Sequence, residues 1–223
     1  MKAVPKNPST RDRLLDAAEA LYADHGLQGV SLRQISTAAG AGGSNAVQYH
    51  FGDVEGLIRA VLERHSQQLE IERATLLARY AARGALSCRE LLEVIYRPIL
   101  GSEDELGAPL FARFSLALLA SPQGWKPMVD ALTTSPVTAQ VLEMTVEANV
   151  HLPRAVTLHR LLYSGIALLT YVVNATRMVS TCEGYTAALT DAFTLATASL
   201  TAPAAEDCTV LAAELEHHFE TAD

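Results

Sequence analysis

The stretch Ser31–Phe51, SLRQISTAAGAGGSNAVQYHF, constrains the fold of this chain more than any other. Ser31 and Gln34 have the capping-box spacing, in which the serine accepts a backbone N–H and the glutamine reaches back to the cap. Apolar residues follow at helical spacing, and Gly40 suits the left-handed conformation that ends a helix. The stretch therefore predicts a short helix over residues 31–39 and then a tight glycine-rich turn.

A second short helix is predicted over residues 44–50, with Ser44 or Asn45 as its N-cap. Val47 and Phe51 are expected to pack in the core against the preceding helix. The helix presents polar and aromatic side chains that suit base edges and phosphates: Asn45, Gln48, Tyr49 and His50. Two helices joined by a glycine-containing turn have the shape of a helix-turn-helix.

The predicted DNA contacts follow from side-chain chemistry. Asn45 and Gln48 can make bidentate contacts to adenine or donate to other bases in the major groove. Tyr49 and His50 are expected to contact phosphate or sugar, which fixes register without reading sequence. Arg33, on the exposed side of the first helix, can reach a phosphate, and the alternative is a solvated charge. The full predicted set is Arg33, Ser44, Asn45, Gln48, Tyr49 and His50.

With its neighbouring segments, this stretch resembles the N-terminal domain of TetR-type transcriptional repressors. The matching features are the amphipathic helix Leu14–Gly26, the segment GVSLRQISTAAG, and Tyr49-His50-Phe51-Gly52 followed by Leu57. The resemblance covers roughly residues 9–65. It implies a dimeric repressor that binds a pseudo-palindromic operator in double-stranded DNA and leaves it when a small-molecule effector binds. It also implies an all-α fold, in which a three-helix DNA-binding domain precedes a larger helical domain.

Composition and charge agree with a helical, folded chain. Alanine and leucine dominate, which favours helices, and the chain is 49% hydrophobic and 19% charged. The net charge is −8, but residues 1–65 hold seven basic and seven acidic residues, so the acidic excess falls on the remainder. An acidic body with a locally neutral head is what a small DNA-reading domain on a larger effector domain would give.

We predict two domains: a DNA-binding domain over residues 1–53 and a ligand-binding and dimerisation domain over residues 54–223. Apolar positions at helical spacing predict a long connecting helix over residues 54–83, which would carry the allosteric signal. Proline and glycine breaks predict six more helices, with Pro136 kinking or splitting the third. Their approximate ranges are 88–100, 107–121, 125–149, 154–180, 184–201 and 205–220.

The segments 154–180 and 184–201 are too apolar for helices with a single buried face, and their small residues allow close helix approach. In the resembling family the last two long helices form a four-helix dimer interface, so this pair is the candidate. The alternative is a monomer core. The expected interface residues are Leu158, Leu162, Gly165, Leu169, Leu189, Phe193 and Ala196.

The part of the chain after the connecting helix also contains bulky apolar residues and a few polar ones that are not assigned to the dimer interface. Small-molecule sites are usually mostly apolar cavities with a few polar groups. The alternative is that these residues form ordinary core. The predicted effector pocket comprises Phe111, Phe114, Leu118, Trp125, Met128, Tyr163, Tyr171, Asn174 and Arg177.

Motifs of the common enzyme classes are absent from the sequence. It contains no G-x-S-x-G, no H-E-x-x-H, no P-loop and no dinucleotide fingerprint, so we expect no enzyme, catalytic residue, cofactor or metal. Cys88, Cys182 and Cys208 are widely spaced and are expected to be idle thiols, with a redox sensor as the alternative.

The N-terminus lacks the apolar core of a signal peptide, and the longest apolar run, around residues 165–173, is too short to span a bilayer. We therefore expect a cytoplasmic protein that does not enter the membrane. The alternative function is a helical protein-interaction module without DNA binding.

Overall fold

The computed structural model describes residues 8–41, 45–101, 108–204 and 206–220, with the backbone alone for 216–220. Within these ranges the secondary structure is helical, which confirms the predicted all-α class. The chain divides into two compact units. The first comprises Met1–Gln67 and Leu110–Leu132, and the second comprises Gln68–Pro109 and Thr133–Asp223.

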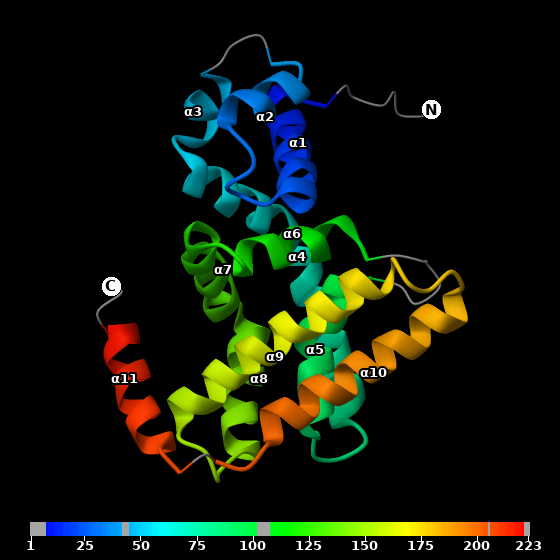
Figure 1. The fold of residues 1–223 in the computed structure, drawn as a ribbon, viewed down its shortest axis with the longest axis vertical. Coiled ribbons are helices and arrows are strands. Elements are labelled where there is room, and N and C mark those ends of the chain that lie inside the picture. The colour runs from blue at the N-terminus through cyan, green and yellow to red at the C-terminus, as the bar shows by residue number, and fades with distance from the viewer. Residues whose placement is uncertain (1–7, 42–44, 102–107, 205, 221–223) are drawn as a thin grey trace. The chain divides into compact units, whose positions relative to one another are not determined.

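The first unit contains the predicted helix-turn-helix (Figure 1). Its helices are α1 (Thr10–His25), α2 (Leu32–Ala38), α3 (Ala46–Phe51), the first half of α4 (Val54–Ala81), α6 (Leu110–Leu119) and α7 (Pro122–Thr134). The inclusion of α6 and α7 has no signal in the sequence, because they lie far along the chain from the helix-turn-helix. Helix α1 packs against both α2 and α6.

Local sequence signals set the helix ends of this unit. Ser31 and Gln34 form the predicted capping box, and Ser9 and Asp12 form a second one at the start of α1. Gly40 has φ +60°, the left-handed conformation expected after α2. Asp53 lies between α3 and α4, and its Oδ1 accepts a hydrogen bond from the backbone N–H of Gly56 at 2.8 Å. Asp53 therefore caps the start of α4.

The core of the first unit is a set of fully buried apolar side chains: Leu14, Leu15, Ala18, Tyr22, Ile35, Val47, Leu57, Ile58 and Phe114. The rings of Tyr22 on α1 and Phe114 on α6 lie 6.5 Å apart between centroids. Val47 belongs to this core, as the sequence predicted, whereas Phe51 is only half-buried.

A buried carboxylate joins α1 to α4. Glu19 is 3% exposed, accepts from Arg64 Nη2, and has both carboxylate oxygens 3.1 Å from His65 Nε2. The His65 ring in turn lies against Phe111 of α6, with centroids 4.1 Å apart. Burial opposes ionisation of Glu19, but the hydrogen bonds and charges of His65 and Arg64 outweigh it and hold the pKa of Glu19 below its ordinary value.

The second unit contains the rest of α4, α5 (Cys88–Leu100), α8 (Pro136–Ala148), α9 (Arg154–Ala175), α10 (Cys182–Thr201) and α11 (Cys208–Glu220). Helices α9 and α10 run antiparallel side by side, and α5 packs against α10 (Figure 1). The predicted helix over residues 125–149 is split into α7 and α8. Pro136 has no backbone N–H to donate within a helix, so it occurs at the first position of α8.

Two charged residues of α4 hold its neighbours in the second unit. Glu70 accepts from the Ser135 hydroxyl and from the backbone N–H of Val137 at 3.1 Å, which satisfies the start of α8. Arg73 is buried and donates from Nε and Nη2 to the carbonyl of Ile95 on α5, both at 3.3 Å. Helix α4 is therefore fixed to α5 and α8 by directional bonds.

Close approach between α5 and α9 depends on Gly165. A Cβ atom built on Gly165 would overlap the phenol ring of Tyr96, and the Tyr96 hydroxyl donates to the carbonyl of Leu161 at 3.4 Å. Burial raises the pKa of Tyr96. The ring therefore occupies the space that any larger residue at position 165 would need.

Helix α9 is long and apolar enough to cross a membrane by length and composition. The apolar run around residues 165–173, considered in the sequence, is only part of this helix. Its most apolar window is 44% buried within the chain, and core helices of soluble proteins meet the same criterion.

We predict that Glu19→Gln lowers the free energy of unfolding by about 1.5–3 kcal/mol at pH 7, because it removes charged hydrogen bonds in a buried setting. The folded pKa of Glu19 is lowered, so its contribution is complete above the ordinary value of 4.5 and is lost as pH falls through the folded pKa. Urea unfolding from pH 7 to pH 3 should show the wild-type and variant curves converging at acid pH.

The matched control for this measurement is Asp24→Asn. Asp24 pairs with Arg113 of α6 in the same unit, but its side chain is 51% exposed, so we expect a loss below about 1 kcal/mol. An equal loss in both variants, or a Glu19→Gln deficit that persists unchanged at pH 3, would contradict the role given to the buried carboxylate.

We predict that Gly165→Ala destabilises the protein by about 1–3 kcal/mol, since the new methyl group must displace the Tyr96 ring. Without that clash, the same change in a helix should stabilise by about 1 kcal/mol. Denaturant unfolding of Gly165→Ala, Tyr96→Ala and the double variant measures the coupling. The double variant should be less destabilised than the sum of the single changes, and simple additivity would refute the contact.

Candidate functional site

The first helix of the candidate site, α2, is fixed to α1 before the turn begins. Arg13 of α1 donates from Nε to the carbonyl of Ala39 at 2.9 Å, directly after α2. Gly40 and Ala41 then donate backbone N–H groups to Thr37 and Ser36 at 3.0 Å each. The chain therefore leaves α2 along a defined path, although residues 42–44 of the turn lie outside the described ranges.

Helix α3 separates a buried side from an exposed side. Val47 is fully buried, while Asn45, Gln48 and Tyr49 are exposed, with Tyr49 86% accessible. Positions three and four apart share one face of a helix, so these three side chains form a common outer surface. Asn45 occupies the N-cap position, without a side-chain hydrogen bond to the helix. The predicted Ser44 lies outside the described residues.

Aromatic and cationic side chains gather at the end of α3. The rings of Tyr49 and His50 meet edge to face at 5.0 Å, and His50 is half-buried. The Arg11 guanidinium of α1 lies 5.2 Å from the centroid of the Phe51 ring. Arg11 was not expected at this site, because nothing in the sequence brings a residue of the first helix to the end of the third.

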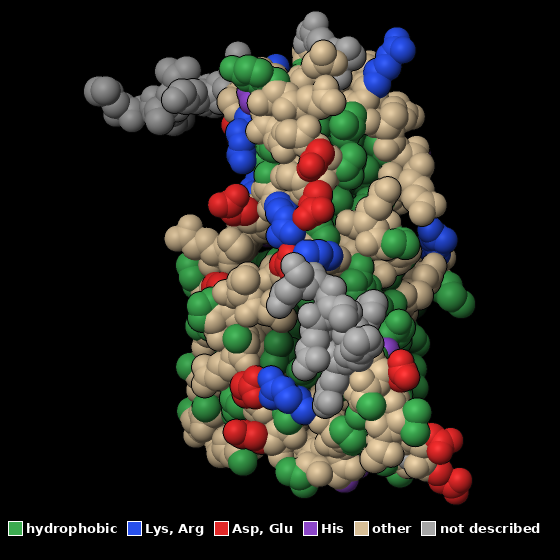
Figure 2. All heavy atoms as spheres, turned by 90° about the vertical axis from the view of Figure 1, so that its left-hand side faces the viewer, with side chains coloured by type: hydrophobic (Ala, Val, Ile, Leu, Met, Phe, Trp, Pro, Cys, Tyr) green, Lys and Arg blue, Asp and Glu red, His purple; other side chains and the backbone are tan. Residues whose placement is uncertain are grey.

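Arg33 is exposed on α2, as the sequence predicted for a phosphate contact. Four other arginines of the first unit are held by carbonyl or carboxylate groups: Arg13, Arg59, Arg64 and Arg113. Arg59 pairs with Glu55 and Asp130 at 2.7 and 2.8 Å, and Arg64 pairs with Asp16 at 2.5 Å as well as with Glu19. On the face drawn in Figure 2, several blue side chains likewise lie beside red ones.

The predicted pocket residues are divided between the two units. The first five lie on α6 and α7: Phe111, Phe114, Leu118, Trp125 and Met128. Of these, Phe111 and Phe114 pack against His65 and Tyr22, so they form part of the core of the first unit. The other four belong to the second unit and are exposed on or just after α9: Tyr163, Tyr171, Asn174 and Arg177.

Most of the predicted dimer residues face inward. Five of the seven are buried within the single chain: Gly165, Leu169, Leu189, Phe193 and Ala196. The other two, Leu158 and Leu162, are half-buried. Helices α9 and α10 bury these five residues within the chain, where the two helices pack against each other and α10 packs against α5.

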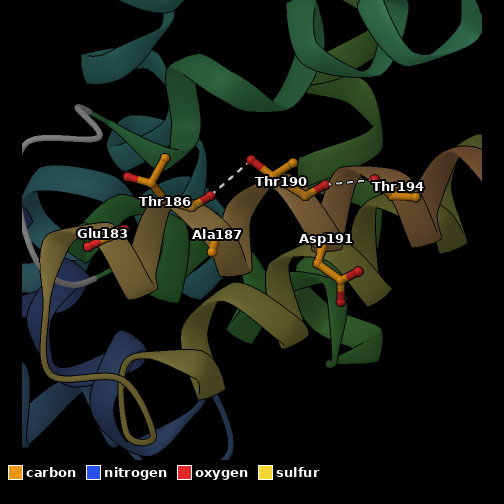
Figure 3. A pocket seen from close by; sticks show the side chains of 6 residues that line it. All are labelled: Glu183, Thr186, Ala187, Thr190, Asp191 and Thr194. Atoms are coloured by element: carbon orange, nitrogen blue, oxygen red, sulfur yellow. Dashed lines mark hydrogen bonds between the residues drawn. The ribbon is translucent and has the colours of Figure 1, made fainter.

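The outer surface of α10 carries small residues along a shallow open groove (Figure 3). Its lining residues are Glu183, Thr186, Ala187, Thr190, Asp191 and Thr194. The hydroxyls of Thr190 and Thr194 donate back to carbonyls of their own helix at 3.0 and 2.9 Å. Larger apolar side chains flank this surface, with Leu195 54% exposed on α10 and Tyr163 51% exposed on α9. The outer face of α10 thus combines small side chains with two acidic residues, Glu183 and Asp191.

Comparison with known proteins finds a family match within the first unit. Residues 14–61 match the family model described as bacterial regulatory proteins, tetR family. No curated protein matches the chain significantly. Among solved structures, one described as a tetR family transcription regulator from Shewanella sp. PV-4 aligns with a TM-score of 0.58 at 16% identity, over 84% of this chain and 97% of that one.

Two further structures align less closely. One described as a TetR-family transcriptional regulator from Rhodococcus sp. has a TM-score of 0.49 at 20% identity, over 84% of this chain and 98% of that one. NalD, described as the secondary repressor of the MexAB-OprM multidrug efflux pump in Pseudomonas aeruginosa, has a TM-score of 0.48 at 20% identity, over 83% and 96%. The match over residues 14–61 thus identifies a tetR-family DNA-binding domain within the first unit, and the alignment with the Shewanella structure shows that the chain shares its fold.

Proposed function

We propose that this protein is a TetR-family transcription regulator that acts as a repressor. It would bind a pseudo-palindromic operator in the cytoplasm and leave it when a small-molecule effector binds. The observation that carries the DNA-binding part is the exposed surface of α3. Gln48, Tyr49 and Asn45 point outward from a short helix whose opposite side, at Val47, is fully buried. A side chain packed this firmly underneath fixes the orientation of the side chains that would enter the major groove.

We further propose that the protein is a homodimer joined through the outer faces of α9 and α10. Ala187 and the back-bonded threonines of α10 would let two helices approach closely, and the exposed Tyr163 and Leu195 would supply apolar area. A two-fold dimer would present two copies of α3, matching the two half-sites of a pseudo-palindrome.

The effector would act through α4, which begins directly after the recognition helix and continues into the second unit. Its residues Glu70 and Arg73 bond to α8 and α5, so movement of those helices would move α4. An effector shifts the equilibrium only by the difference between its affinities for the two states. Release of the operator by tenfold requires about 1.4 kcal/mol of such coupling.

The competing function is a helical interaction module whose first unit binds another protein. The neutral charge of residues 1–65 makes this alternative worth testing, since most DNA-binding domains are basic. The two functions differ in one measurable property, because binding of a protein partner by this unit would leave no sequence-selective affinity for duplex DNA.

We predict that the purified protein binds the DNA flanking its own coding region more tightly than unrelated DNA, as measured by fluorescence anisotropy. Tyr49→Ala should weaken binding to all sequences, because a phosphate or sugar contact carries no sequence information. Gln48→Ala should weaken binding and also flatten the difference between cognate and altered bases, by about 1–3 kcal/mol at the base it reads.

Ile71→Ala serves as the control for these variants, since Ile71 is exposed on α4 in the second unit. If Gln48→Ala binds DNA with an unchanged sequence preference, the assignment of base recognition to Gln48 is wrong. If no duplex is preferred even after selection from random sequences, the DNA-binding function itself is lost.

We predict that Ala187→Arg dissociates the dimer, because it places a large charged side chain where α10 would meet its symmetry mate. Ala78→Arg introduces the same change on an exposed position of α4 and should leave the mass unchanged. Light scattering at micromolar concentration distinguishes the two. A monomeric wild-type protein, or an Ala187→Arg variant that stays dimeric, would rule out this interface.

A further inference from the structure

The recognition segment carries no permanent positive charge. The sequence has no lysine or arginine between Arg33 and Arg59, a span that includes the end of α2, the turn, all of α3 and the start of α4. Guanine is most often recognised by an arginine or lysine, whose donors meet the O6 and N7 acceptors together. This segment cannot make that contact.

Cations from the surrounding helices do not replace the missing charge. Arg59, Arg64 and Arg113 form ion pairs with carboxylates of the same unit, and Arg13 bonds the carbonyl of Ala39. Within residues 8–41 and 45–67, Arg11 and Arg33 are the two arginines without a recorded carboxylate or carbonyl partner. Arg11 is placed at the end of α3 by its contact with Phe51.

The start of α4 is also closed to phosphate. A helix N-terminus normally offers backbone N–H groups and a positive dipole end to anions. Here Asp53 accepts the Gly56 N–H at 2.8 Å, so a carboxylate already occupies that position. Glu55 adds a second negative charge in the same turn, and Arg59 pairs with it.

What the segment does offer is neutral amide groups. The exposed side chain of Gln48 presents an NH2 donor group and an oxygen acceptor, and this pair matches the N7 acceptor and N6 donor of adenine. Against guanine, the amide can use only its NH2 group, because N7 and O6 are both acceptors and the amide oxygen has no partner there. The chemistry of this surface therefore favours adenine over guanine at the bases that α3 reads.

We propose that the first unit recognises adenine in preference to guanine through the amide of Gln48, and that Arg11 and Arg33 supply its main phosphate neutralisation. The inference rests on the proposed function and specifies the class of DNA that it would take: half-sites whose contacted purines are adenines. Such binding is governed by base-edge hydrogen bonds more than by counterion release.

The first test uses the duplex recovered by random-sequence selection with the full-length protein. Each purine is replaced in turn by its 7-deaza analogue, which lacks the N7 acceptor. At one or two adenines per half-site the affinity should fall about five- to tenfold, while 7-deazaguanine should change it less than twofold at every position. Gln48→Ala should lose the sensitivity at one of those adenines. A guanine whose N7 is required would overturn the proposal.

The second test measures the salt dependence of the same binding, in a Lys2→Gln/Lys6→Gln background so that the N-terminal residues make no contribution. Four arginines in a dimer give a slope of log K against log salt of about −4. Arg11→Gln or Arg33→Gln should each make the slope less steep by about 2. Arg83→Gln removes the same charge from an exposed position in the second unit and should leave the slope unchanged.

The outcomes separate the inference from the function on which it depends. If selection recovers no preferred duplex, the proposed DNA-binding function is refuted, and the proposed preference for adenine is refuted with it. If a preferred duplex is bound with a slope steeper than about −7 in the Lys2→Gln/Lys6→Gln background, the protein is a DNA-binding regulator but the proposal of few phosphate contacts is refuted. A slope near −4 that neither arginine variant changes also refutes the assignment to Arg11 and Arg33.

Discussion

The position of the recognition helix depends on the carboxylate of Glu19, which is buried between α1 and α4. Arg64 and His65 bond to it from α4, and His65 also lies against Phe111 of α6. Burying a carboxylate is unfavourable unless its oxygens are satisfied, so these partners can adopt few other arrangements. Since α1 carries α2 and the chain of α4 begins where α3 ends, fixing α1 to α4 fixes the helix-turn-helix between them.

The sequence predicted those features of the fold that short-range chemistry decides. The capping box of Ser31 and Gln34 and the left-handed Gly40 each depend on residues close together in the chain, and each lies where the sequence predicted it. Contacts between distant segments left no such signal. Nothing in the chain indicated that α6 and α7 belong to the first unit, or that Arg11 lies over Phe51.

The apolar helices α9 and α10 show a different limit of sequence interpretation. Their composition indicated that more than one face is apolar, but periodicity does not tell which face meets the same chain and which is left outside. Gly165 and Phe193 fill the inner faces against α5, while Ala187 and Leu195 remain outside. Similarly, the aromatics of α6 have the composition of a pocket wall, yet Phe111 and Phe114 pack against His65 and Tyr22.

A surface that relies on base edges would suit the proposed release from the operator. Arginine and lysine side chains are long and flexible, so a phosphate contact survives a shift of about 1 Å in the supporting helix. A bidentate amide–adenine contact does not, because hydrogen bonds weaken steeply once distance and angle depart from their narrow optimum. If Gln48 supplies most of the specificity, a small displacement of α3 through α4 removes a large share of the operator affinity. The ion pairs that withhold Arg59 and Arg64 from DNA would then contribute twice, by keeping the first unit rigid and by leaving its binding sensitive to the spacing of the two recognition helices.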